Sequence, residues 1–419
     1  MERIKKIVER IWYLLGLVGG YLICSFQQKL RTLPENTRSI MVTLDEENLY
    51  RDNDGDGRYA YLFLNRFSEA GYNVYFYKHI SLLGFVGLRK YGRMIYSIKN
   101  LKFISKPPVQ TETMIYAFDS VREDLLSLHW KKLTYVNLIR PTFCQVGKKL
   151  NIPYFFHPFK YQSNKYRNFE QLRSNARKIR IFFGGNACEA YVNNQYHDLR
   201  LYNQMSRLEA IQAIVGTSPR IKTINKVNEF YSFLDSHNND YSNECYLLQT
   251  DKVPYVNMKN WFEIVSKSDF FLCLSGIELP MCHNTLEAMA VGTIPILSYP
   301  DWFFPRLEHG KNAIIYSGKE DLIKKLNEVF AMSSKDIKKM QENVVEYYEK
   351  YQSAESFFVN YEALGSINTV MMHPRLICKE KENKRGEQLL SKLKNFVELR
   401  KDLRYGVKSS DPIPVAVQQ

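Results

Sequence analysis

Twice along this chain, short apolar runs alternate with segments of helical period, and this repeated alternation limits the possible folds more than any other feature. The first series covers residues 38–160 and the second begins at residue 179. Strands that alternate with helices form parallel sheets covered by helices. We therefore predict an α/β fold with two Rossmann-like, doubly wound parallel-sheet domains that face each other across a cleft. The 419 residues also exceed what one hydrophobic core usually holds.

The first series begins with a buried strand, "RSIMVTL", and continues with a helix, a glycine turn and a second strand in "GRYAYLFLNRFSEAGYNVYFY". The predicted elements are strands over 38–44, 73–77, 113–118, 133–138 and 152–158, with helices over 58–71 and 140–151.

The second series begins with "IRIFFGG", a strand that ends in a Gly-Gly turn. The predicted strands lie at 179–185, 244–250, 269–276, 293–299 and 312–318, and the predicted helices at 202–216, 257–268, 319–330 and 334–364. This order suggests six segments along the chain: a basic, hydrophobic segment 1–34, a first Rossmann-like domain 35–165, a linker 166–178, a second Rossmann-like domain 179–350, a returning helix 351–375 and a basic tail 376–419.

The chain carries a net charge of +14, which favours polyanionic partners. No helix-turn-helix, zinc-finger or RNA-recognition signature accompanies this charge. We therefore expect nucleotide phosphates and an anionic membrane surface as partners, and no nucleic acid. The seven cysteines show no C-x-x-C spacing, so neither a zinc site nor a disulfide framework is indicated. A reducing cytosol is the simplest location.

A hydrophobic segment follows the basic N-terminus "MERIKKIVER". Residues 11–26, "IWYLLGLVGGYLICSF", are uncharged and mostly apolar, and Lys29 and Arg31 follow them. A membrane-spanning helix needs about 20 apolar residues, so this segment is short for a span, and no small-residue cleavage site of a secretory signal is evident. Three alternatives remain: an interfacial or re-entrant anchor, a marginal single span, and an added core helix. The first places the protein at the cytoplasmic face of the membrane, as a peripheral or monotopic protein.

The segment "PMCHNTLEAMAVGTIPILSY" (280–299) indicates where a ligand binds. A loop after an apolar strand leads directly into a helix of small residues that contains Glu287. Ligands of doubly wound sheets bind beyond the carboxyl ends of the strands, and a helix N-terminus there favours phosphate. A carboxylate one turn into the helix can accept hydrogen bonds from two sugar hydroxyls. The pattern therefore predicts a nucleotide site, with the ribose on Glu287 and the phosphates near the helix start.

Phosphates also need donors and cations near this helix start. Arg207 is a candidate because it opens a helix face, although a surface salt bridge is the commoner role of such a residue. His283 and Asn284 could donate to a phosphate oxygen, and residues of these types also serve as N-caps.

The first half of the chain offers further candidates at the cleft between the two predicted domains. Gly57 and Arg58, in "RDNDGDGRYAYLF", enter the first helix and would line the cleft, unless the turn is a surface turn. The aspartates of this segment resemble a calcium loop, but Phe63 occupies the twelfth position, where a bidentate glutamate is required. If the reaction inverts configuration, His157 or Asp56 would be the base; a structural role is the alternative for His157.

"LEAMAVGTIPIL" after "ELP" resembles the donor-binding signature of the GT-B glycosyltransferases, most closely the retaining, exostosin-like and capsular or lipopolysaccharide-type branches. "IRIFFGGN" and "DWFFPRLEHGKNAIIYSGKEDL" are placed as in that superfamily. The resemblance covers about 179–350, whereas the first half is similar only in its order of elements.

The resemblance implies roles for several residues. Glu287 matches the ribose-binding glutamate, and Glu278 the sugar-contacting one, although it lies nine positions before Glu287, one more than in many retaining members. Residues that the resemblance places at the donor are Gly184, Gly185, Asn186 and Leu286. The resemblance also implies that domain 179–350 binds the nucleotide-sugar and that domain 35–165, with Gly57 and Arg58, lies on the acceptor side. No cofactor is expected, because the nucleotide-sugar is a substrate, and no metal is required, because a helix N-terminus and nearby cations can stabilise the departing diphosphate.

The leading hypothesis is thus a membrane-associated glycosyltransferase that moves a sugar from a nucleotide-sugar to a surface glycan or a lipid-linked acceptor in polysaccharide biosynthesis, with retention of configuration. The alternative is a non-catalytic GT-B-like scaffold protein in a polysaccharide assembly complex. A nicotinamide-dependent enzyme lacks support, because no G-x-G-x-x-G follows a first strand. Nucleic-acid binding would show a steep dependence on salt.

Overall fold

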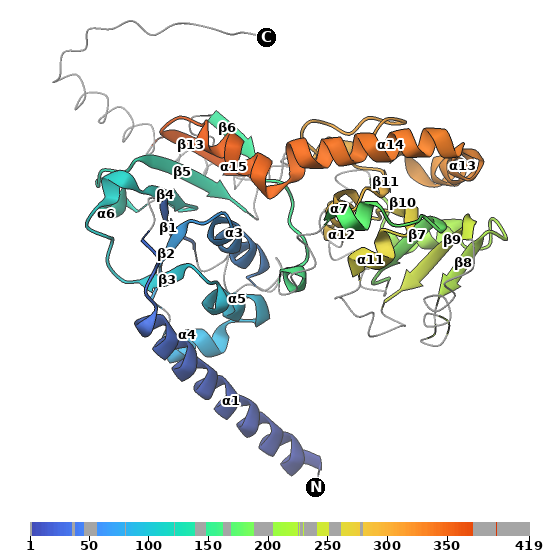
Figure 1. Ribbon diagram of the computed structural model, residues 1–419. Coiled ribbons are helices and arrows are strands. Elements are labelled where there is room, and N and C mark those ends of the chain that lie inside the picture. The colour runs from blue at the N-terminus through green and yellow to red at the C-terminus, as the bar shows by residue number, and fades with distance from the viewer. Residues whose placement is uncertain are drawn as a thin grey trace, which may run out of the picture.

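The protein folds around two parallel β-sheets, each with its own helices (Figure 1). The computed structural model describes residues 2–35, 38–45, 57–79, 81–120, 122–138, 148–161, 169–187, 204–224, 226, 229, 241–250, 261–276, 280–371 and 391. The expected fold class, two Rossmann-like parallel-sheet domains, is confirmed.

The first sheet has seven strands in the order β3-β2-β1-β4-β5-β13-β6, and all neighbouring strands are parallel. Its strands are β1 (Ser39–Thr43), β2 (Asn73–Tyr77), β3 (Leu101–Ile104), β4 (Ile115–Phe118), β5 (Lys132–Asn137), β6 (Lys148–Asn151) and β13 (Ile367–Met371). The chain adds β2 and β3 on one side of β1 and then places β4 on the other side. The topological switch point of this sheet therefore lies between β1 and β4.

The second sheet has six strands in the order β12-β11-β10-β7-β9-β8, again all parallel. Its strands are β7 (Ile179–Gly185), β8 (Ile221–Ile224), β9 (Tyr241–Gln249), β10 (Ser268–Leu272), β11 (Ile294–Leu297) and β12 (Ile314–Ile315). After β9 pairs with β7, the chain crosses to the other side of β7 to form β10. The switch point therefore lies between β7 and β10.

Helices connect the strands and cover both sheets. In the first half these are α3 (Arg58–Glu69), α4 (Leu82–Gly87), α5 (Lys90–Met94) and α6 (Glu123–Leu126), with 3₁₀ turns η2 (Ile95–Ser97), η3 (Thr111–Thr113) and η4 (Pro158–Lys160). In the second half they are α7 (Phe169–Arg173), α9 (Arg207–Ile214), α11 (Trp261–Val265), α12 (His283–Ala290), α13 (Gly318–Ala331), α14 (Ser334–Tyr347), α15 (Ala354–Glu362), the 3₁₀ turn η8 (Pro300–Trp302) and the π turn η9 (Tyr348–Gln352).

Helix α3 shows why the first helix lies deep in its domain. Its residues from Ala60 to Ser68 are all buried, as expected of a helix that is enclosed on every side. The helix begins after Gly57, whose φ of 79° lies in the left-handed region that glycine tolerates best. This turn brings Arg58, the first residue of α3, to the carboxyl-end side of β1.

Three of the predicted strands and helices have a different secondary structure in the protein. Residues 148–151 form strand β6 rather than the end of a helix, and 139–147 lie outside the described residues. Residues 152–157 form no strand; they connect the two halves, and the N–H of Phe156 donates to the Tyr161 hydroxyl. The helix expected over 334–364 is divided into α14, η9 and α15, because Ser353 starts a new helix by capping the N–H of Ser356.

The segment expected to return as a helix, 351–375, contains both helix and strand. Residues 354–362 form α15, whereas 367–371 form β13, which pairs with β5 and β6 of the first sheet. The periodicity stops at Gly365, and the five-residue strand after it is too short to stand out in the sequence. Figure 1 shows α14 above the second sheet and α15 and β13 back at the first.

Helix α1 (Glu2–Leu30) extends away from the first domain towards the N-terminus (Figure 1). Its last turns are attached to the domain: the Gln28 side chain donates to the carbonyl of Tyr96 at 3.4 Å and accepts from the N–H of Phe103 at 3.2 Å. Arg31, just after the helix, donates to the carbonyls of Ile98 and Leu101 at 2.5 and 2.9 Å. By length and composition, residues 4–30 could cross a membrane.

Candidate functional site

The start of helix α12 lies at the topological switch point of the second sheet. The helix follows β10, and the amide of Asn284 in its first turn donates to the carbonyl of Gly184 near the end of β7, at 2.9 Å. β7 and β10 are the two strands between which the chain reverses its direction of winding. The carboxyl ends of such strands are the usual ligand position in open α/β sheets.

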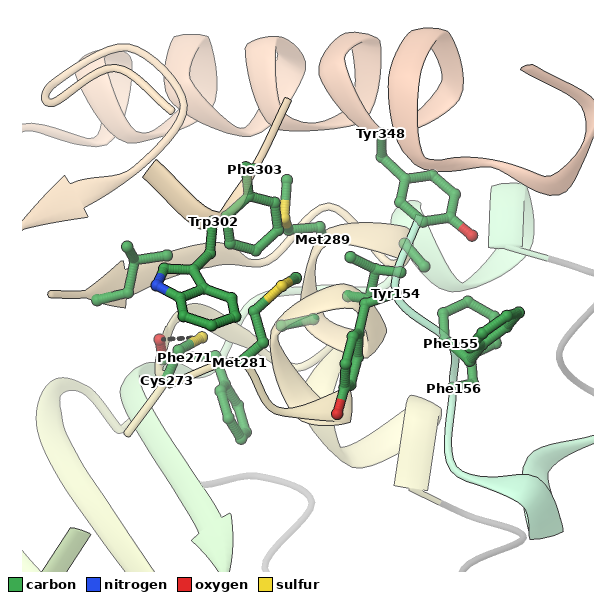
Figure 2. Packing of buried hydrophobic residues seen from close by; sticks show 14 of the residues in the cluster. Tyr154, Phe155, Phe156, Phe271, Cys273, Met281, Met289, Trp302, Phe303 and Tyr348 are labelled. Atoms are coloured by element: carbon green, nitrogen blue, oxygen red, sulfur yellow. Dashed lines mark hydrogen bonds between the residues drawn. The ribbon is translucent and has the colours of Figure 1, made fainter. Parts of the chain in front are cut away.

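The sequence of α12 explains how closely it packs on this sheet. Ala288, Met289 and Ala290 are completely buried, and the small side chains let the helix lie against its neighbours. The helix ends at Ala290, and Gly292, whose φ of 73° lies in the left-handed region, then turns the chain into β11. Figure 2 shows Met281 and Met289 near this helix, with Phe155 and Phe156 of the connection between the domains to one side. The Phe156 and Tyr348 rings stack there with centroids 6.5 Å apart.

Glu287 is buried at the contact between the two halves of the chain. Only 3% of the residue is exposed, and its Oε1 accepts the backbone N–H of His157 at 2.9 Å. A buried carboxylate needs hydrogen-bond donors or a cation to compensate for lost hydration. A carboxylate oxygen has two lone pairs, so one backbone bond leaves Glu287 with further capacity to accept.

His283, the first residue of α12, is held in one tautomer. Its Nδ1 lies 2.5 Å from the carbonyl oxygen of Phe155, and a carbonyl can only accept, so Nδ1 carries the proton. Burial, and then the nearby Arg58, lower the pKa of His283 well below its usual value. The ring is therefore neutral, and its Nε2 accepts from Arg58 Nη1 at 3.3 Å.

This contact joins the first residue of α3 to the first residue of α12. Each of these helix N-termini carries a partial positive charge of about half a unit. The Arg58 guanidinium also lies over the Tyr91 ring, 5.2 Å from its centroid. Among the residues that the structure describes, the buried Nε of Arg58 has no hydrogen-bond acceptor. The sequence placed Gly57 and Arg58 on the acceptor side; the structure places Arg58 against α12.

His157 is engaged at both ring nitrogens. Its Nδ1 accepts the N–H of Phe159 at 3.4 Å, and its Nε2 lies 3.2 Å from the Tyr91 hydroxyl. Burial, followed by the positive charge of Arg58, lowers the pKa of His157 to about 3. The neutral ring therefore carries its proton on Nε2 and donates it to Tyr91. As a general base, His157 would first have to give up the bond at Nδ1, so a structural cap describes its present geometry better.

Lys160, two residues beyond the proline that follows His157, is a buried cation that the sequence analysis did not select. It is 1% exposed, and burial lowers the pKa of its ammonium to about 8, while the charge of Glu287 opposes that shift. Its Nζ lies 5.1 Å from the centroid of the Trp261 ring. The carboxylate of Glu287 and the ammonium of Lys160 are therefore close enough to interact electrostatically.

Arg207 fixes the geometry on the other side of the helix start. Its Nη1 donates to the carbonyl of Asn186 at 2.8 Å, and its Nη2 donates to the sulfur of Cys282 at 2.9 Å. Arg207 is the first residue of α9 and is only 4% exposed, so it is not a surface ion-pair residue. The side chain thus ties the turn after β7 to the residue before α12.

The Gly-Gly turn after β7 serves packing. A Cβ on Gly184 would lie 2.7 Å from the Trp261 ring, and a Cβ on Gly185 would lie 3.3 Å from Arg207 Nη1. Gly184 therefore makes room for an aromatic side chain rather than for open space. The role of both glycines and of Asn186 at donor phosphates stays a prediction. Leu286, also predicted at the donor, is 1% exposed and belongs to the hydrophobic core.

Two predicted residues, Glu278 and Asp56, lie outside the described residues. The structure therefore brings together Glu287, His283, Asn284, Arg207, His157 and Arg58 around α12. Lys160 and Trp261 join them without a signal in the sequence, since a lysine after "FFHPF" and a tryptophan at a helix start are common on surfaces. In the described part of the chain, His, Cys, Asp and Glu side chains form no group of three or more that could hold a metal ion.

The two parallel-sheet domains, each with its own helices, define an α/β protein of Rossmann-like domains. No family model and no curated protein matches the sequence. Among solved structures, the chain is similar to HepE of Anabaena in complex with UDP, at 8% identity and a TM-score of 0.40, over 78% of this chain and 98% of that one. It is also similar to WaaG, a glycosyltransferase involved in lipopolysaccharide biosynthesis, at 10% identity and a TM-score of 0.31, over 78% and 99%. TM-scores this low carry no argument about function.

Proposed function

We propose that the protein is a glycosyltransferase that moves a sugar from a nucleotide-sugar to a surface glycan or lipid-linked acceptor at the cytoplasmic face of a membrane, as in capsule, O-antigen or lipopolysaccharide synthesis. One observation carries this proposal: the buried carboxylate of Glu287 lies close to the start of α12 together with the cations Arg58, Lys160 and Arg207. The carboxylate suits two ribose hydroxyls, and the positive charge suits a diphosphate.

The same charges support the chemical step. When the bond between sugar and nucleotide breaks, negative charge develops on the departing diphosphate. Fixed cations and helix N-termini stabilise such charge most in a site that excludes water, because they need no reorganisation during the reaction. Arg58 and His283 bring two helix N-termini to one place, and Arg58 Nε has a proton to donate there. Retention of configuration fits this site, since both imidazole rings are engaged and a retaining reaction needs no separate base.

Binding of the nucleotide would also act on the hydrogen bond that Glu287 makes within the protein. Its Oε1 accepts the N–H of His157, which belongs to the connection between the domains. A ribose hydroxyl would either share this oxygen or replace the N–H. Domain movement that opens and closes this contact would admit the donor and then exclude water.

The test is a thermal-shift screen of the full chain against UDP-, GDP-, CMP- and dTDP-sugars. One nucleotide class should raise the melting temperature, because a ligand at a hundred times its Kd stabilises the folded state by about 2.7 kcal/mol. The Glu287→Gln variant should lose most of this shift, whereas Glu263→Gln, which changes an exposed carboxylate on α11, should keep it. If no nucleotide-sugar raises the melting temperature of the wild type, the proposal fails.

A second candidate function, a non-catalytic GT-B-like scaffold in a polysaccharide assembly complex, is favoured by one contact. The bond between Glu287 and the His157 N–H joins the connection between the domains to α12, so the carboxylate could serve only to hold the domains together. For a scaffold, Glu287→Gln would lower the melting temperature of the ligand-free protein, and no nucleotide-sugar would be hydrolysed or transferred by the wild type.

A further inference from the structure

Helix α1 has two opposite faces, of which only one is in contact with the first domain. The domain-contacting face includes Tyr21, whose ring lies 5.6 Å from that of Phe85 on α4, and Gln28, which bonds to Tyr96 and Phe103. Tyr21, Cys24, Gln28 and Arg31 follow one another at intervals of three and four residues and are at least partly buried. These spacings put them on one side of the helix.

The other face carries an apolar stripe along the length of the helix. Its exposed side chains recur at the same helical spacing, and the residues of this apolar stripe are Ile4, Ile7, Val8, Ile11, Leu14, Leu15, Leu22 and Phe26. From Ile4 to Phe26 the stripe extends over about 33 Å. By 100° per residue the centre of the stripe lies about 130° around the helix from the centre of the domain-contacting face, although Leu14 at one edge lies close to Tyr21. Trp12, Ile23 and Leu30 are also exposed and continue the apolar surface on the side away from Leu14. Exposed apolar surface of this extent marks an interaction site rather than ordinary protein surface.

We propose that α1 lies in the plane of the membrane interface, with the apolar stripe buried among the lipid chains and its opposite face fixed to the first domain. The proposal rests on the membrane association within the proposed function, but not on sugar transfer. The partner is a bilayer that contains anionic lipids.

Charge favours this partner. Lys5, Lys6 and Arg10 are exposed and fall outside the apolar stripe by helical spacing, and Lys29 follows its last residue. Long cationic side chains beside an apolar face reach the headgroup phosphates while their stems stay in the interface. Trp12 and Tyr13, both well exposed, are residue types that gather at headgroup level.

The width of the stripe distinguishes a bilayer from a second copy of the helix. A two-helix coiled coil needs only a narrow seam, with charged residues at the flanking positions. Here Ile7, Leu14 and Phe26 widen the apolar face beyond the seam formed by Ile4, Val8, Ile11, Leu15 and Leu22. A broad apolar face with cations at its sides is typical of helices that lie on membranes.

Length argues against a spanning orientation. The part of α1 that precedes Tyr21, residues 2–20, measures about 28 Å, and its uncharged stretch, residues 11–20, measures only about 15 Å, about half of the hydrocarbon core of about 30 Å. It also contains six charged residues, three of them Lys5, Lys6 and Arg10. A span would therefore draw the attached domain surface into the lipid.

The experiment measures co-sedimentation of the full chain with phosphatidylcholine vesicles that contain or lack phosphatidylglycerol. Two variants change neighbouring positions with similar exposure: Leu15→Glu on the apolar stripe, 56% exposed, and Tyr13→Glu off it, 60% exposed. Leu15→Glu should weaken binding by about tenfold or more, because it removes a buried leucine from the lipid. Tyr13→Glu should change binding several-fold less, and vesicles without phosphatidylglycerol should bind less protein.

Other outcomes overturn the proposal in identifiable ways. Equal loss in both variants would indicate a spanning helix, in which every position faces lipid or protein. A dimer in the absence of vesicles that Leu15→Glu converts into a monomer, with vesicle binding unchanged, would assign the stripe to a second copy. Neither result bears on nucleotide-sugar binding, which the thermal-shift screen tests separately with the same preparations.

Discussion

The backbone N–H of His157 donates to Oε1 of Glu287 at 2.9 Å, and this bond helps connect the segment between the domains to the helix that starts at the switch point of the second sheet. The bond makes the proposed ribose-binding carboxylate sensitive to the position of the first domain. Changes at either residue should therefore affect donor binding and the ligand-free structure together.

Glu287→Ala should raise the donor KM by about a hundredfold or more, because a charge-assisted hydrogen bond to a ligand contributes about 1.5–3 kcal/mol and the ribose would lose two of them. Steady-state kinetics with the nucleotide-sugar found by the screen would measure it. Glu263→Ala is the matched control and should leave the KM unchanged. An unchanged KM in Glu287→Ala would remove the ribose role.

His157 should make the protein sensitive to acid. Its folded pKa of about 3 lies below its ordinary value of 6.5, so between these values the unfolded chain binds a proton that the folded protein does not. Stability is therefore lost as the pH falls from 6.5 towards 3, by on the order of a few kcal/mol.

Urea denaturation at several pH values would show this slope. His157→Gln should flatten it, whereas His129→Gln, which changes an exposed histidine, should not. A slope that is the same in the wild type and in His157→Gln would contradict the buried, neutral ring.

Lys160 should make the stability of the protein depend on pH under alkaline conditions. Its folded pKa of about 8 lies below the usual 10.5, so between these values only the unfolded chain holds the proton. Stability therefore rises as the pH increases from 8 to 10.5, and this rise should be missing in Lys160→Met.

Affinity for a nucleoside diphosphate should change in the opposite direction, falling above pH 8 as the positive charge of Lys160 is lost. Titration calorimetry at pH 7 and pH 9 would compare wild type and variant.

Gly184→Ala should destabilise the second domain by about 1–3 kcal/mol, because the added Cβ would overlap the Trp261 ring in a packed core. Gly365→Ala is the control, since a Cβ there meets nothing within 4 Å. Calorimetric melting would distinguish the two. Equal melting temperatures for both variants would show that the Trp261 ring can move aside without loss.

Much of the fold follows from sequence pattern, and the exceptions have physical causes. The apolar runs that became β1, β7 and β10 are buried on both faces, so they stand out as continuous hydrophobic segments. Strands β3 and β8 are short and partly exposed, and they give no such signal.

The sequence predicted those site residues whose position depends on local sequence. It missed those that only tertiary packing brings to the site. Glu287, His283 and Asn284 belong to one helix whose place after a strand is visible in the sequence. Lys160 reaches the same region only because the connection between the domains passes beside α12, which no local pattern reveals. Nε2 of His157 likewise meets Tyr91 only through the fold, whereas the bond between its Nδ1 and the N–H of Phe159 is local.

The position of β13 between β5 and β6 has a consequence for synthesis on the ribosome. The strand nearest the end of the described chain fills an interior place in the sheet that the beginning of the chain builds. The N-terminal sheet therefore stays incomplete during translation until residue 371 has left the exit tunnel, although every strand of the other sheet, up to residue 315, has already emerged. The domain that is translated second can finish folding first.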